Sequence, residues 1–330
     1  MVALVGPTAS GKSGVARQVA LAVPGVELVS VDSMAVYRGM DIGTAKPTPE
    51  EREGLRYHLI DLVDPWEEFT VRQFQTAGVA ALSGIRARHH GSLLVGGTGL
   101  YLRSLVDGLV FPGRYPAVAA SLDEALDGAG PEGGDGRTRA LAELHQRLAG
   151  LDPVAAARIG PSNRRRLVRA LEVTLGAGRP FSSFGPGLER YPPTPVTLVG
   201  LAYDPAETDR RITERFGQLM ERGFLAEVAS LASRSGGMSR TARQALGYRE
   251  LLGHLEEGVP LAEAVDTAVR RTRSFARRQM AWFRRDPRIV WLDPDADPVG
   301  AVAALFGLPV APGSAGSRGG AGVGDWSPTP

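Results

Sequence analysis

The sequence predicts an α/β protein built on a parallel sheet flanked by helices. Near the start of the chain, residues 2–5 form a short apolar run that ends at a glycine, as buried strands often do. Residues 11–22 then show helical spacing of apolar side chains and stop before Pro24 and Gly25. A second short strand is expected at residues 27–32, and this alternation is typical of a parallel sheet.

The same alternation continues along the chain. Residues 71–88 have the spacing of a helix, and residues 92–95 form the next apolar run, followed by a glycine-rich turn. Two further β-like runs lie much later, at residues 196–203 and 288–292. We therefore expect the sheet to be completed by strands from the last third of the chain.

The segment between these halves has a different character. It opens at Phe111-Pro112-Gly113, closes at Tyr191-Pro192-Pro193, and contains helical patterns at residues 141–151 and 164–175. Its mostly helical pattern predicts an insertion domain in the α/β core. The expected organisation is a core at residues 1–109 and 194–308, a helical insertion at 110–193, and a disordered Gly/Pro/Ser-rich tail at 309–330.

Composition excludes several classes of protein. The 330 residues include no cysteine, which rules out disulfide scaffolds, Cys-ligated zinc, Fe–S clusters and thiol catalysis. We find no apolar run long enough to span a membrane and no signal peptide at the N-terminus, so we expect a cytoplasmic protein with no membrane partner. The net charge of +2 does not by itself suggest a polyanionic partner, although it can conceal local basic patches.

A phosphate-binding loop follows the first strand. The segment fits the pattern G-x-x-x-x-G-K-[ST] and lies between a strand and a helix, where backbone N–H groups and the helix N-terminus can hold an oxyanion. Lys12 would reach the outer phosphate and the Ser13 hydroxyl would bind Mg²⁺. This predicts a P-loop NTPase-like fold. The loop residues are Gly6, Pro7, Thr8, Ala9, Ser10, Gly11, Lys12 and Ser13.

Asp32 ends the second predicted strand and is the first candidate catalytic residue. It should lie at the carboxyl edge of the sheet beside the phosphate loop, where ligands bind in α/β folds. It could hold Mg²⁺ through water, act as a general base, or only cap the turn that follows. A phosphate loop permits an ATPase, a GTPase, a kinase or a transferase whose leaving group is diphosphate, and Asp32 alone does not choose among them.

The turn at residues 96–99 should reach the same edge of the sheet. Its glycines permit close approach to a ligand, and Thr98 offers a hydroxyl group. No acidic residue follows the strand at residues 92–95, which argues against an ordinary nucleotide hydrolase. A tight structural turn is the alternative interpretation.

Arginine is concentrated in a helix near the end of the core. Residues 270–288 contain eight arginines and one aspartate, a local charge of +7. An extended arginine surface without interleaved acids suits phosphate backbones, although a solvated face is the alternative. At 100° per residue, the packed side of this helix comprises Ala268, Thr272, Phe275, Gln279, Trp282 and Phe283.

Two further arginine groups are candidates for anion binding. In the insertion, helical spacing leaves Arg165, Arg166 and Arg169 free for a ligand, so that two basic surfaces could clamp a nucleic acid. Arg211 and Arg215 are four residues apart and share one helix face. Either could complete the phosphate site or pair with neighbouring acids, and the spacing does not decide between them.

Together these motifs resemble the tRNA dimethylallyltransferase family of bacterial type, also called tRNA isopentenyltransferases. The similarity spans roughly residues 2–293, and the order of the motifs is far more specific than the phosphate loop. The matching segments are GPTASGKS (6–13), SVDS (30–33), YRGMDIGTAKP (37–47), GGTGLY (96–101), RRRLVRALEV (164–173), RQALGYRE (243–250) and TRSFARRQMAWF (272–283).

The resemblance implies a P-loop fold that binds the diphosphate of dimethylallyl diphosphate, with Mg²⁺ on Ser13, and does not hydrolyse ATP. Asp32 would take a proton from the exocyclic N6 amine of the adenosine 3′ of the tRNA anticodon. Lys12 and Arg211 or Arg215 would neutralise the departing diphosphate, and Thr98 would contact the base. The implied tRNA contacts are Asp32, Ser33, Met34, Ala35, Thr98, Arg165, Arg166, Arg169, Gln244, Gly247, Tyr248, Arg249, Arg273 and Arg277.

Three other functions remain as alternatives. An adenylate isopentenyltransferase would act on free AMP, ADP or ATP, but a mononucleotide needs no extended arginine surface. A P-loop small-molecule kinase and an NTP-switched RNA-binding protein would share the phosphate loop alone. Because one chain carries every part that the reaction needs, we expect a monomer.

Overall fold

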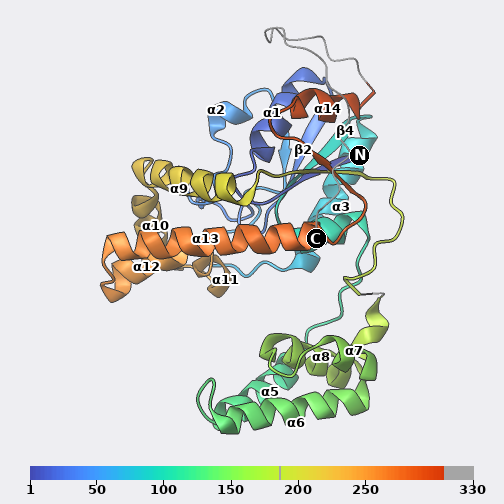
Figure 1. Cartoon of the computed structure of the whole chain (residues 1–330), viewed down its shortest axis with the longest axis vertical. Helices are drawn as coiled ribbons and strands as arrows, with labels where there is room; N and C mark the ends of the chain where they lie inside the picture. The colour runs from blue at the N-terminus through green and yellow to red at the C-terminus, as the bar shows by residue number, and fades with distance from the viewer. Residues whose placement is uncertain (186, 308–330) are drawn as a thin grey trace.

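The computed structural model describes residues 1–185 and 187–307 of the chain. Its core is a six-stranded sheet, parallel throughout, in the order β3-β2-β4-β1-β5-β6 (Figure 1). The predicted α/β class is confirmed, and so are all five predicted strands. The strands are β1 (Val2–Val5), β2 (Val26–Val31), β3 (Tyr57–His58), β4 (Gly91–Gly96), β5 (Thr197–Leu201) and β6 (Ile289–Leu292).

The sequence pattern missed one strand, and the predicted tail is not described. β3 contributes only two residues to the edge of the sheet, too few to show a period-2 pattern. The expected tail at residues 309–330 lies outside the described residues.

Helices cover both faces of the sheet, and β1 is therefore buried on both sides. Ala3 and Val5 face one apolar cluster, whereas Val2 and Leu4 face the other. The second cluster is closed by α1 (Lys12–Ala22) and α14 (Pro298–Ala304). The first is closed by α3 (Val71–Ala87), α4 (Gly99–Val106), α9 (Pro205–Glu221), α10 (Phe224–Ala232), α12 (Tyr248–Glu257) and α13 (Leu261–Phe283).

The register of the central strands brings the carboxyl ends of β1, β2 and β4 to the same level of the sheet. Gly96 at the end of β4 lies opposite Val5 of β1 and opposite Val31 of β2. A Cβ atom on Gly96 would lie 2.0 Å from the carbonyl oxygen of Val31, so this close pairing requires glycine. The segments that follow β1, β2 and β4 therefore start side by side.

The insertion forms a separate helical lobe, joined to the core by two segments of chain (Figure 1). Its own apolar core includes Leu126, Leu148 and Leu171. Buried Arg103 on α4 ties the returning segment to the core by donating to the carbonyl groups of Leu188 (2.9 Å) and Arg190 (2.6 Å). The lobe contains α5 (Pro116–Gly128), α6 (Asp135–Leu151), α7 (Pro153–Arg158), α8 (Arg164–Ala177) and a 3₁₀ turn (Phe181–Phe184).

Three of the helical segments that were not predicted are too short to show a clear pattern. They are α2 (Pro49–Arg52), α11 (Arg240–Arg243) and α14, each of which lacks enough turns to establish a 3.6-residue period. Among the described helices, none combines the length and apolar character needed to cross a membrane.

A buried carboxylate joins β2 to β3 and to the segment before β4, at the opposite end of the sheet from the phosphate loop. Glu27 of β2 accepts hydrogen bonds from Arg88 (2.8 and 2.9 Å) and lies 2.6 Å from His58 Nε2 and 2.7 Å from His90 Nδ1. Its side chain is only 2% exposed. The Arg88 hydrogen bonds, with help from the two histidines, lower the pKa of Glu27 to about 2 against the opposing effect of burial.

We predict that Glu27→Gln lowers the free energy of unfolding at neutral pH by about 2 kcal/mol, because charge-assisted hydrogen bonds are lost. A carboxylate whose pKa is depressed stabilises the fold above its unfolded pKa, ordinarily near 4.5, and loses that effect as the pH falls towards about 2. Urea unfolding of both proteins between pH 7 and pH 3 should therefore show a difference that narrows on acidification. A constant difference would contradict this assignment.

Candidate active site

The phosphate loop lies between β1 and α1, as predicted. A Cβ atom on Gly6 would lie 2.2 Å from the carbonyl oxygen of Leu201, so the turn out of β1 requires glycine. Gly11 and Ala9 adopt positive φ angles of 80° and 63°, which turn the loop into the first turn of α1. The Ser10 hydroxyl is buried and has no hydrogen-bond partner within the described structure. The loop therefore has the geometry of an anion cradle.

Two cations and one carboxylate gather beside this loop. Lys12 Nζ donates to the carbonyl group of Pro7 (2.9 Å), and burial together with the nearby Arg215 lowers the pKa of Lys12 to about 8. Burial also lowers the pKa of Arg215, while Asp32 acts in the opposite direction on both cations. Within the described chain none of the three forms an ion pair, so both cations are available to an anion.

Asp32 shapes the turn that follows β2. Its Oδ1 accepts hydrogen bonds from the N–H groups of Met34 (2.8 Å) and Ala35 (3.3 Å), so the capping role considered from the sequence is present. The structure gives the other carboxylate oxygen, Oδ2, no hydrogen bond within its described part. The turn thus fixes the carboxylate by one oxygen and leaves the second for chemistry.

Thr98 connects this turn to the end of β4. Its Oγ1 accepts a hydrogen bond from the N–H group of Ser33 (3.2 Å), and its own N–H donates to the carbonyl group of Val31 (3.3 Å). Because Oγ1 acts as the acceptor towards Ser33, its hydroxyl proton remains able to donate to a ligand. The structure therefore brings Lys12, Asp32, Thr98 and Arg215 to one edge of the sheet.

Arg211 does not belong to this group, although the sequence could not separate it from Arg215. Its Nε donates to Glu207 (2.6 Å), and its guanidinium lies 3.6 Å above the ring of Tyr203. Both interactions engage Arg211 at its own end of α9, which favours Arg215 as the arginine beside the phosphate loop; the diphosphate contact of either residue stays a prediction. Both arginines are half-buried and lie one turn of helix apart, but of the two only Arg211 has an ion-pair partner among the described residues.

Four of the predicted tRNA contacts are buried or already paired within the described structure. Tyr248 is fully buried with its hydroxyl donating to Glu227 (2.5 Å), and Gly247 beside it is also buried. Arg169 pairs with Glu172 (2.8 Å) and donates to the carbonyl groups of residues 112 and 113, so it is not free for a ligand. Ala35, 6% exposed, packs into the core.

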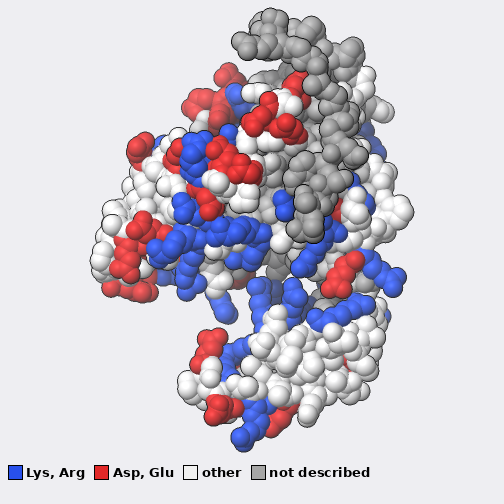
Figure 2. Space-filling view, in the orientation of Figure 1, with Lys and Arg blue, Asp and Glu red and all other residues white. Residues whose placement is uncertain are grey.

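The other predicted tRNA contacts differ in exposure and in their partners. Figure 2 shows Lys and Arg side chains gathered along α13 and on both sides of the hollow between core and insertion. Arg273 is half-buried and donates to Thr213 (2.7 Å), whereas Arg277 is exposed and lies 3.3 Å from Asp209. The exposed predicted contacts are Arg165, Arg166, Gln244, Arg249 and Arg277.

Sequence reasoning assigned one site residue, Gln279, only to the packed side of α13. Its Oε1 accepts from the N–H group of Thr8 (2.9 Å), and its Nε2 donates to the carbonyl group of Gly97 (2.9 Å). Gln279 is 8% exposed. The sequence held one signal for this role: Gln279 is an amide on the packed side of the helix. A buried amide must find polar partners, so it indicated a hydrogen-bonding role there.

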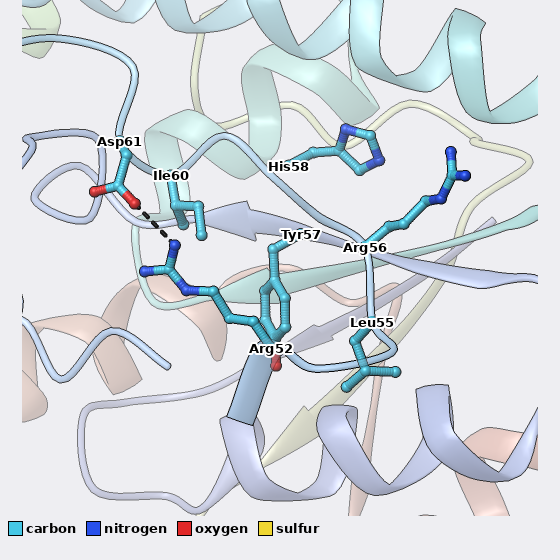
Figure 3. Close-up of a pocket in the computed structure, with 7 residues that line it drawn as sticks. All are labelled: Arg52, Leu55, Arg56, Tyr57, His58, Ile60 and Asp61. Atoms are coloured by element: carbon cyan, nitrogen blue, oxygen red, sulfur yellow. Dashed lines mark hydrogen bonds and ion pairs between the residues drawn. The ribbon is translucent and has the colours of Figure 1, made fainter. Parts of the chain in front are cut away.

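A second hollow of about 560 Å³ lies between α2 and β3 and contains none of these residues (Figure 3). Its Arg52 is already occupied by Asp61 (3.0 Å) and the carbonyl group of Pro47 (2.8 Å). His58, on the same wall, bonds to Glu27. With these polar groups paired, we assign the candidate site to the phosphate loop.

The chain is similar to known proteins over most of its length. The family model described as "IPP transferase" matches residues 35–286. The chain is 44% identical over 310 residues to a tRNA dimethylallyltransferase of Desulforudis audaxviator, covering 93% of this chain and 96% of that protein. It is 45% identical over 293 residues to the tRNA dimethylallyltransferase of Salinispora arenicola, covering 89% of this chain and 82% of that protein.

Two solved structures are also similar. A tRNA isopentenylpyrophosphate transferase from Bacillus halodurans matches with a TM-score of 0.64 and 35% identity, over 93% of this chain and 95% of that one. A eukaryotic dimethylallyltransferase acting on tRNA matches with a TM-score of 0.71 and 25% identity, over 92% of this chain and 77% of that one.

Arg211 and Arg215 of α9 provide a matched test of the site. We predict that Arg215→Gln weakens binding of inorganic diphosphate at least about tenfold, because a charge-assisted hydrogen bond contributes about 1.5–3 kcal/mol. Arg211→Gln should change the affinity by no more than about twofold, since its partners are Glu207 and Tyr203. Isothermal titration of both variants at pH 7 measures the difference. Equal weakening would place the anion elsewhere.

Proposed function

The chain belongs to the IPP transferase family, and we propose that it prenylates tRNA: it transfers the dimethylallyl group of dimethylallyl diphosphate to the exocyclic N6 amine of the adenosine 3′ of the anticodon. The observation that carries this proposal is the meeting of Lys12, Arg215 and Asp32 at the carboxyl edge of the sheet. A diphosphate needs the cations, and a weakly nucleophilic aromatic amine needs a carboxylate nearby.

The phosphate loop is suited to hold the donor by its diphosphate. Backbone N–H groups of the loop and the N-terminus of α1 face the oxyanions, and Lys12 and Arg215 neutralise the charge that grows as the C–O bond breaks. Because the pKa of Lys12 is about 8, its charge is present at neutral pH and declines in more alkaline solution. The loop thereby favours departure of diphosphate with the bonding electron pair.

Asp32 is placed to receive the proton of the acceptor. As the amine nitrogen bonds to the prenyl C1 atom, the C1–O bond breaks and a proton leaves the nitrogen for the free Asp32 oxygen. Hydrogen bonds from Met34 and Ala35 hold the carboxylate in place during this step. Thr98, fixed by its bond to Ser33, can donate its hydroxyl proton to the base.

The donors present fit a Mg²⁺ ion that enters with the diphosphate. Ser13 lies exposed in the first turn of α1, and no cluster of three acidic or histidine residues in the described ranges could hold a metal independently. Mg²⁺ commonly takes few protein ligands and completes its shell with phosphate oxygens and water. When bound, it would neutralise part of the diphosphate charge, with Ser13 as its protein ligand.

The basic surface favours tRNA over a free nucleotide as acceptor. Exposed arginines on the insertion lobe and on α13 face the hollow between the lobes (Figure 2). Such a surface matches the phosphate backbone of an RNA stem, and the target base must leave its stack to reach Asp32. We further propose that a monomer acts on tRNA in the cytoplasm.

The decisive assay presents both acceptors to the same protein. Purified protein, Mg²⁺ and dimethylallyl diphosphate are incubated separately with unmodified tRNA and with AMP, and the nucleosides are analysed by mass spectrometry. Prenylated adenosine in tRNA and unmodified AMP are expected. Modification of AMP but not tRNA would assign the chain to the adenylate enzymes, and ATP hydrolysis without prenylation would indicate a kinase or switch.

The role of α13 in tRNA binding gives a separate prediction. Arg277→Ala should reduce the slope of log affinity against log salt concentration by about one, because one phosphate contact is lost. Arg210→Ala is the control: Arg210 is similarly exposed, 56% against 58%, but pairs with two carboxylates, Glu207 and Glu214, whereas Arg277 has the one longer pair with Asp209 (3.3 Å). Filter binding of tRNA from 50 to 300 mM salt measures both slopes. Identical slopes for Arg277→Ala and the unaltered protein would remove α13 from the interface.

A further inference from the structure

Gln279 joins the phosphate loop, which would hold the prenyl donor, to the turn after β4, which would contact the acceptor base. Its side-chain amide receives the Thr8 N–H from the phosphate loop and donates to the Gly97 carbonyl group beside Thr98 (2.9 Å each). Both partners are backbone groups with a fixed donor or acceptor character. The amide can therefore satisfy both in only one orientation.

The contact between α13 and the turn after β4 is close along its length. A Cβ atom on Gly97 would lie 2.3 Å from Gln279 Nε2, and one on Gly99 would lie 2.0 Å from Trp282 Nε1. A side chain at either position would force the Gln279 or Trp282 side chain, or the turn itself, to move. The side chains of α13 therefore pack directly against the backbone of residues 97–99.

A path made of hydrogen bonds and peptide links runs through this amide. It leads from Thr8 through Gln279 to Gly97, the next residue is Thr98, and Thr98 holds the N–H group of Ser33 next to Asp32. One end of the chain belongs to the diphosphate cradle and the other to the proposed proton acceptor. Beyond the point where β1 and β4 pair directly, the Gln279 side chain holds these two loops together.

The same helix supports the remaining cation of the site. Arg273 and Arg277 on α13 reach Thr213 and Asp209 on α9, the helix that carries Arg215. α13 therefore contacts the phosphate loop, the turn after β4 and α9. Gln279 is its only side chain recorded as hydrogen-bonding to both loops in the described part of the chain.

We propose that Gln279 is a positioning residue of the transfer reaction, which fixes the distance between the bound diphosphate and the Asp32 carboxylate. The inference rests on the proposed function for the identity of the reaction. It assigns to Gln279 no contact with either substrate. Its effect passes through Thr8 on the donor side and through Gly97 and Thr98 on the acceptor side.

The first experiment compares buried Gln279 with half-buried Gln75, because each amide bonds to two backbone groups. Gln279→Met keeps the volume and removes both hydrogen bonds; Gln75→Met is the control, because Gln75 Nε2 donates to the carbonyl groups of Ser104 (2.8 Å) and Leu109 (2.9 Å). Single-turnover rate constants, the KM for dimethylallyl diphosphate, tRNA affinity and Tm are measured for both variants.

Gln279→Met should lower the single-turnover rate constant about a hundredfold, the cost of displacing reacting groups by about 1 Å, and should weaken inorganic diphosphate binding several-fold. tRNA affinity should stay within about threefold of the unaltered protein. Gln75→Met should lower Tm by a similar amount without changing the rate constant. A rate constant for Gln279→Met equal to that of the control, with Tm reduced in both, would overturn the proposal.

A second variant separates positioning from packing through pH. In Gln279→Glu the new group still accepts from Thr8, but when ionised it faces the Gly97 carbonyl group with no proton to donate. Protonation restores the donor. The ratio of the variant's rate constant to that of the unaltered protein should therefore rise as the pH is lowered from 8 to 5.5. A ratio independent of pH would contradict the proposal, whereas absence of prenylation by the unaltered protein would instead reject the proposed function.

Discussion

The alignment of three strand ends is the constraint on which the rest of the site depends. Gly96 pairs at the same level with Val5 and with Val31, so the segments leaving β1, β2 and β4 begin together. From them come the phosphate loop, the Asp32 turn and the Thr98 turn. A shift of one residue in either pairing would reverse the facing of every side chain in the moved strand and separate the cations from the carboxylate. The glycine at position 96 is required because the carbonyl group of Val31 occupies the space of a side chain.

Charge is distributed according to burial. Of 38 basic residues only two are lysines, and they serve different ends. Lys12 faces the proposed diphosphate site, whereas Lys46 is fully buried and pairs with Asp41 (2.8 Å) and Asp61 (2.6 Å). Arginine supplies the surface around α13 and the insertion, where exposed guanidinium groups can meet phosphates (Figure 2). The net charge of +2 is therefore an average over a strongly basic hollow and acidic stretches elsewhere.

Much of the fold was predictable because its signals are local. Apolar runs gave the five longer strands, and the phosphate loop was evident from its spacing and its place between strand and helix. Features that depend on tertiary contacts were not accessible: the pairing of β3, the choice between Arg211 and Arg215, and the burial of Tyr248 beneath α10. Tyr248 lies within a motif shared with the family, yet its hydroxyl binds Glu227, which also holds the backbone of residues 41–43. Gln279 was visible only as an amide on an apolar helix side, and its two partners lie 271 and 182 residues away in sequence.

The central claim is that Asp32 removes the proton from the acceptor while its other oxygen maintains the turn. Asp32→Asn separates the two roles, because the amide oxygen can still accept from Met34 and Ala35. The most direct measurement is the single-turnover rate of tRNA prenylation by this variant at saturating donor, alongside its affinity for tRNA. The account predicts a rate at least about a hundredfold lower with tRNA affinity within about threefold. A rate close to that of the unaltered protein, or a loss of affinity as large as the loss of rate, would contradict it.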